Sequence, residues 1–110
     1  MSDLNLVRVT LLELGLEDWI PVPEAVSTVR ARGSRQPEQD VRDVLGALGR
    51  EGRVRFWRGK WDREDEHVEV SVDEAVDLLA DPRWFHFDLD GPAEDRLYFV
   101  NVKNIAPASI

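Results

Sequence analysis

Histidines and paired carboxylates are the residues of this 110-residue chain that could support acid–base or metal chemistry. The only histidines, His67 and His86, lack the HxxxH spacing with which a helix presents two metal ligands. Asp88 and Asp90 stand beside a predicted turn, where aspartate is favoured by its bonds to the backbone. The sequence has no GxxxxGK[ST], GxGxxG or GxSxG pattern. We therefore predict no catalytic residues, no metal site and no cofactor, and we do not expect an enzyme.

Arginine and tryptophan offer a different chemistry, the binding of phosphates or of a partner surface. The net charge is −8, but residues 30 to 63 hold ten basic and five acidic residues. That segment therefore carries +5 and leaves −13 on the rest of the chain, and a partner responds to this local sign. Two of the four tryptophans, Trp57 and Trp61, fall in the basic segment, so we predict that they contact a partner.

One helix must position several of these side chains. It is predicted from apolar residues at the spacing i, i+3, i+4 and i+7, which are Val41, Val44, Leu45 and Leu48. Pro37 suits its first position, while Gly49 and Gly52 favour its end. If the four apolar residues face inward, steps of about 100° place on the outward side Gln39, Arg42, Asp43, Gly46 and Arg50, with Gly49 at its edge.

The segments before this helix predict two more helices. Apolar residues at helical spacing predict the first over residues 3 to 14, with Gly15 as its stop. A short strand follows over residues 19 to 22, and Pro23 opens the second helix, which ends near residue 32. The first of these helices is so rich in leucine and valine that other elements must cover it.

The segments after it predict strands and one further helix. We expect a basic strand over residues 53 to 60 and a return strand over 68 to 70, joined by a charged loop. Ser71 and Glu74 have the spacing of a capping box and predict the start of a helix. Two last strands are predicted over residues 84 to 87 and 97 to 102, with a turn at 90 to 92.

The order helix, short strand, helix, turn, helix, hairpin over residues 3 to 71 resembles a winged helix-turn-helix domain. The resemblance implies a three-helix core with a β-hairpin wing. Residues 72 to 110 have no counterpart in the minimal domain, and their apolar residues predict that they pack against its core. We therefore predict a single α+β domain over residues 1 to 110, in which a C-terminal helix and strand pair extend the winged-helix-like part.

Our leading functional hypothesis is non-catalytic, regulatory binding of double-stranded DNA. The resemblance implies that the third helix and the wing make the contacts. Arginine, lysine and glutamine are the side chains that bind phosphates and base edges. The predicted nucleic-acid-binding residues are Gln39, Arg42 and Arg50 on the helix, and Arg55, Arg58 and Lys60 on the wing.

The alternative hypothesis is a protein–protein interaction module, such as an adaptor, an inhibitor or an immunity-type partner. It would use an acidic C-terminal surface to bind a basic protein. The acids that motivate it are Asp73, Glu74, Asp77, Asp81, Asp88, Asp90, Glu94 and Asp95. Homodimer formation is left open. No membrane partner is expected, since the sequence has no apolar run of about 18 residues, and we expect a cytoplasmic location.

Overall fold

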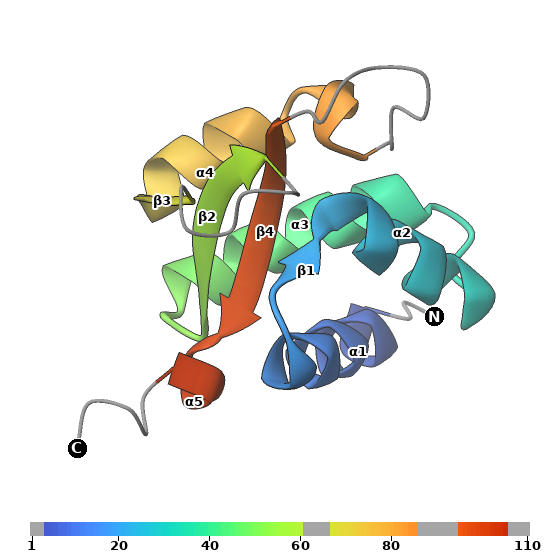
Figure 1. The fold of residues 1–110 in the computed structure, drawn as a ribbon. Coiled ribbons are helices and arrows are strands. Elements are labelled where there is room, and N and C mark those ends of the chain that lie inside the picture. The colour runs from blue at the N-terminus through green and yellow to red at the C-terminus, as the bar shows by residue number, and fades with distance from the viewer. Residues whose placement is uncertain (1–3, 61–66, 86–94, 106–110) are drawn as a thin grey trace.

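The computed structural model describes residues 4–60, 67–85 and 95–105. It confirms the α+β class, with helices and one antiparallel sheet (Figure 1). The elements, in chain order, are α1 (Leu4–Glu17), β1 (Ile20–Pro21), α2 (Val22–Ala31), α3 (Pro37–Arg50), β2 (Val54–Lys60), β3 (Val68–Val70), α4 (Val72–Leu79), the 3₁₀ helix η2 (Pro82–Phe85), β4 (Asp95–Asn101) and α5 (Val102–Ile105).

The sheet has the strand order β1-β4-β2-β3. The predicted hairpin of β2 and β3 is confirmed, with Phe56 opposite Val70. The strand β4, from the C-terminal extension, lies between β1 and β2 and pairs with β2 along its whole length. The extension is therefore part of the central sheet, as Figure 1 shows, because β4 supplies hydrogen bonds to strands on both sides.

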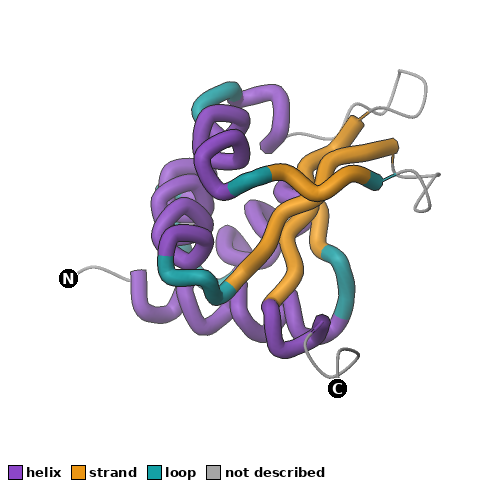
Figure 2. The backbone as a smooth tube through the Cα atoms, turned by 90° about the vertical axis from the view of Figure 1, so that its left-hand side faces the viewer, coloured by secondary structure: helices purple, strands orange, loops and turns teal. Residues whose placement is uncertain are grey.

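The core lies between one face of this sheet and the helices. Phe56 and Phe99 are opposite one another on β2 and β4, and both are fully buried. Leu11 of α1 and Leu45 of α3 are fully buried as well and belong to the same cluster. Figure 2 shows the helical turns gathered mainly on one side of the strands. The period-two alternation of β2 thus sends Val54 and Phe56 inward and Trp57 to the other face.

The first helix is longer than predicted. We expected it to stop at Gly15, but α1 continues to Glu17. Gly15 is buried, and a Cβ atom on it would lie 2.6 Å from the backbone nitrogen of Asn101. The glycine is therefore explained by the close approach of β4 to α1, and the prediction of a helix stop was wrong.

The segment after β3 partly matches its prediction. Ser71 caps α4, since its Oγ accepts a hydrogen bond of 3.1 Å from the amide of Glu74. The predicted strand over residues 84 to 87 was wrong in its first half, because Trp84 and Phe85 belong to η2. Both rings are buried, so their burial rather than strand pairing accounts for their apolar character. Residues 86 to 94, including the predicted turn, lie outside the described residues.

Candidate functional site

The buried face of α3 is the predicted one. Val41, Val44, Leu45 and Leu48 are all buried. The opposite face differs from its prediction, because Gly46, predicted outward, and Gly49, predicted at the edge of the outward side, are both buried. A Cβ atom on Gly46 would lie 3.8 Å from Val76, and one on Gly49 would lie 3.3 Å from Val72, both residues of α4. The helix α4 therefore covers part of the face that was predicted to approach DNA.

Arg42 is held by this covering segment. Its Nε donates a hydrogen bond of 2.6 Å to the carbonyl oxygen of Leu79, and its guanidinium lies 4.8 Å from the centre of the Phe85 ring. Gln39 accepts a bond of 3.2 Å from Arg42 and donates one of 2.8 Å to Asp43. Two of the three predicted contact residues on α3 are thus bound within the fold.

Two of the three cations predicted on the wing also have partners in the protein. Arg55 makes a two-pronged ion pair with Glu69 on β3, including a bond of 2.6 Å from its Nε, and this bonding raises the pKa of its guanidinium. The guanidinium of Arg58 lies 5.2 Å from the centre of the Trp84 ring. A cation that is already paired has less to gain from a phosphate.

Arg50 and Lys60 are the predicted contact cations that remain exposed without an ion-pair partner among residues 4–60, 67–85 and 95–105. Arg50 ends α3, before β2 begins, and Lys60 is the last residue of β2. A strand of this length spans about 20 Å, so the two cations stand near opposite ends of the sheet. They do not form a cluster.

The outer face of the sheet carries an aromatic cluster, which we define as Trp19, Trp57, His67 and Tyr98. Trp57 and Tyr98 are opposite one another on β2 and β4. Trp19 stacks on Trp57 with ring centres 5.0 Å apart and on His67 at 5.3 Å, and His67 stacks on Tyr98 at 4.7 Å. The predicted partner residue Trp57 is half-buried in this cluster, and Trp61 lies outside the described residues.

His67 has no metal-site geometry. Its Nε2 is 2.8 Å from the carbonyl oxygen of Lys60, while its Nδ1 is buried with no hydrogen-bond partner in the described part of the chain. A Cβ atom on Gly59 would lie 2.3 Å from the ring, so the absence of a side chain there makes room for the histidine. Sequence reasoning missed the cluster because its members come from four separate segments. The alternation along β2 and along β4 was the signal that could have paired Trp57 with Tyr98.

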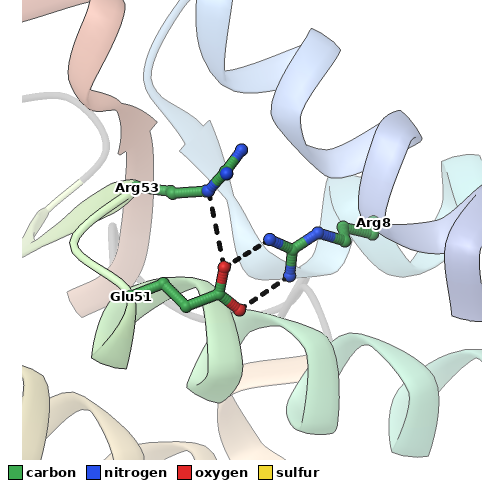
Figure 3. Close-up of polar contacts among 3 residues, drawn as sticks. All are labelled: Arg8, Glu51 and Arg53. Atoms are coloured by element: carbon green, nitrogen blue, oxygen red, sulfur yellow. Dashed lines mark hydrogen bonds and ion pairs between the residues drawn. The ribbon is translucent and has the colours of Figure 1, made fainter.

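A network of three charges joins α1 to the turn between α3 and β2. Glu51 accepts two hydrogen bonds from Arg8, one of 2.8 Å to Nη1, and its carboxylate lies 3.4 Å from Nε of Arg53 (Figure 3). These interactions, the hydrogen bonds from Arg8 first, lower the pKa of Glu51. All three side chains are partly exposed, so the network orients the turn more than it stabilises the fold.

Among the described residues, ion pairs are formed by Arg8, Arg32, Arg53 and Arg55, and none of these pairs involves an acid of α4. Asp73, Glu74 and Asp77 are exposed, and none of them forms an ion pair with another described residue. Asp81 accepts a hydrogen bond of 3.0 Å from the amide of Arg83 and so begins η2. Asp88, Asp90 and Glu94 lie outside the described residues, and Asp95 begins β4. The described part of the predicted acidic surface is therefore the exposed side of α4.

Within the described residues, no group of three or more His, Cys, Asp or Glu side chains could hold a metal ion, and no helix is long and apolar enough to cross a membrane. Comparisons of the chain with protein-family models, with curated proteins and with solved structures find no match. The winged-helix interpretation stays a prediction.

Proposed function

We propose that this chain is a non-catalytic protein-interaction module on a winged-helix-like scaffold, and that it binds a basic protein through the acidic side of α4. One observation carries the proposal. Arg42, Arg55 and Arg58 are engaged within the protein, whereas Asp73, Glu74 and Asp77 of α4 are exposed without an ion pair among the described residues. The acids of α4 are thus more available to a partner than these predicted cations are.

The position of α4 also favours a protein partner over DNA. The helix α4 packs across Gly46 and Gly49. At these glycines the backbone of α3 could otherwise have approached a DNA groove most closely. The exposed residues of α3 are Gln39, Asp43 and Arg50. An acid on this face repels phosphates, and two dispersed cations, Arg50 and Lys60, give little counterion release.

The stability of α4 explains Asp73 and Glu74, which lie in its first turn, where the macrodipole favours a negative charge, but it does not explain Asp77. Asp73 and Asp77 are four residues apart and repel one another across one turn. Asp77 is also close to the C-terminus of the helix, where the macrodipole favours a cation, and α4 has no basic residue in its last turn. A binding role would explain why Asp77 is present at this end of the helix.

The class of partner follows from this chemistry. An adaptor, inhibitor or immunity-type protein that binds a basic surface would gain association rate and selectivity from such acids. The aromatic cluster offers Trp57, which is half-buried and flanked by Arg55, as an apolar contact for the same kind of partner. We propose a cytoplasmic location. Disulfides are rare there, so a chain without cysteine forgoes no stabilising cross-link.

Two fluorescent probes test the proposal, a peptide of about 20 residues rich in arginine and lysine, and a random DNA duplex of about 20 base pairs. Anisotropy at low salt, with protein up to tens of micromolar, covers the usual range of nonspecific DNA binding. We expect the peptide to bind and the duplex not to bind. We expect the double variant Asp73→Asn/Asp77→Asn to weaken peptide binding by about threefold or more.

The matched control is Glu17→Gln/Glu24→Gln, which removes two exposed acids elsewhere and gives the same net charge. It should keep the wild-type affinity for the peptide. An equal loss in both double variants would mean that total charge rather than α4 attracts the peptide, and the proposal would be wrong. Duplex binding that disappears in Arg50→Ala/Lys60→Ala would establish DNA as the ligand instead.

A further inference from the structure

The helix α1 has a second apolar side that the described residues leave uncovered. Its inner side packs Val7 and Leu11 into the core. Five large hydrophobic side chains are exposed in the described part of the chain, and two of them, Val9 and Leu16, lie two turns apart on the outer side of α1. A surface helix normally carries polar residues on its outer side. The apolar outer side of α1 therefore indicates a contact with another surface.

This side of α1 forms one wall of a groove. Val9, Leu12 and Leu16 line the wall, at the spacing of a helical seam, and the groove has a volume of about 390 Å³. Arg53, Val102 and Lys103 line the other side. The volume is sufficient for a few side chains from another element.

The floor of the groove is fixed by Asn101. Its side-chain amide donates a hydrogen bond of 3.1 Å to the carbonyl oxygen of Leu12, and its Oδ1 accepts one of 2.9 Å from the amide of Lys103. Asn101 is buried, and its two hydrogen bonds join α1 to the start of α5. The two walls are held at a fixed separation, so the groove is formed before anything binds.

The two walls carry opposite charges. Glu13 lies on the α1 side, while Arg53 and Lys103 lie on the other side. Glu13 and Arg53 each have a single ion-pair partner among the described residues, at 3.5 and 3.4 Å, and their side chains remain 58% and 57% exposed. An α1 helix placed in the groove would bring its own Glu13 toward Arg53 and Lys103.

We infer that the groove binds the α1 helix of a second copy of this chain, giving a homodimer with twofold symmetry. In such a dimer each α1 supplies both the apolar ridge and one wall of the groove, so the same surface is complementary to itself. Each Glu13 then faces the two cations of the other copy. The dimer uses no residue of α4, so its test is independent of the proposed binding of a basic protein.

The test is the mass in solution of the full chain, by size-exclusion chromatography with light scattering and by sedimentation equilibrium up to about 100 µM, where weak interfaces are populated. We expect the wild type to reach twice the mass of one chain. Leu16→Glu places a charge at the seam on an exposed position and should raise the dissociation constant about tenfold or more. Val68→Glu, at a position that is 66% exposed on β3, is the matched control and should stay dimeric.

Charge reversal tests the arrangement of the two copies. Glu13→Lys should weaken the dimer, and Arg53→Glu/Lys103→Glu should weaken it as well. Combining all three changes should restore it. Thermal melts of every variant check that the chain is folded, since Glu13 also pairs with Arg32. A wild type that is monomeric throughout the range, or a folded triple variant that stays monomeric, would overturn the inference.

Discussion

Arg42 Nε lies 2.6 Å from the carbonyl oxygen of Leu79 and donates a hydrogen bond to it. This contact joins α3 to the last residue of α4. A helix ends with carbonyl groups that lack partners, and a guanidinium satisfies one of them while it neutralises the negative end of the macrodipole. The side chain predicted to read DNA therefore has a structural role here, as a cap of the neighbouring helix.

The first prediction follows from this role. Arg42→Ala should lower the free energy of unfolding by about 1 to 3 kcal/mol, since a charged hydrogen bond and the contact with Phe85 are lost together. Urea denaturation measures the change. Arg50→Ala is the control, because Arg50 is exposed and should change stability by about 0.5 kcal/mol or less. Equal, negligible effects of both substitutions would mean that Arg42 does not hold α4.

Elements with a strong local signal were predictable from the sequence. The spacing of Val41, Val44, Leu45 and Leu48 identified the buried face of α3, and all four residues are in the core. Equally local patterns predicted the hairpin of β2 and β3 and the cap at Ser71. Each of these depends on residues close together in the chain, so periodicity and capping chemistry suffice.

Features that depend on distant segments were not predictable. A helical wheel places Gly46 and Gly49 away from the core, but it cannot show that α4 packs over them. Likewise, the pattern of β4 predicted a strand but not its position between β1 and β2. The structural role of Arg42 was not predictable for the same reason, because its partner Leu79 lies 37 residues further along the chain.

The second prediction concerns pH. Glu51 has a folded-state pKa below its ordinary value of 4.5, first because of its hydrogen bonds from Arg8. A lowered carboxyl pKa stabilises the fold above the unfolded-state pKa, and this contribution is lost as the pH falls through the folded-state pKa. The wild type should therefore be more stable than Glu51→Gln near pH 7, and the difference should disappear in strong acid.

Urea midpoints of both proteins, measured from pH 7 down to about pH 2, test this. The carboxylate is exposed, so added salt should shrink the difference at pH 7. Glu17→Gln is the control, an exposed carboxylate of α1 with no ion pair among the described residues. A difference for Glu51→Gln that is constant across the pH range would exclude the ion pair as its source.

The last prediction compares two helical glycines. Inside a helix, alanine is normally favoured over glycine by about 0.5 to 1 kcal/mol, provided that its Cβ meets no clash. At Gly46 the nearest atoms to a new Cβ would be Arg50 Nη1 at 3.7 Å and Val76 Cγ2 at 3.8 Å, both ordinary contacts. Gly46→Ala should therefore raise the free energy of unfolding by up to about 1 kcal/mol.

At Gly15 the same substitution should have the opposite sign. The new Cβ would lie 2.6 Å from the backbone nitrogen of Asn101, and a backbone atom in an inner strand of the sheet cannot move aside as a side chain can. We expect Gly15→Ala to lower the free energy of unfolding by about 1 to 3 kcal/mol, the usual effect of overpacking. Urea denaturation of both variants decides the matter. If Gly15→Ala were as stable as Gly46→Ala, the close contact between α1 and β4 would be wrong, and the groove built on Asn101 would be wrong with it.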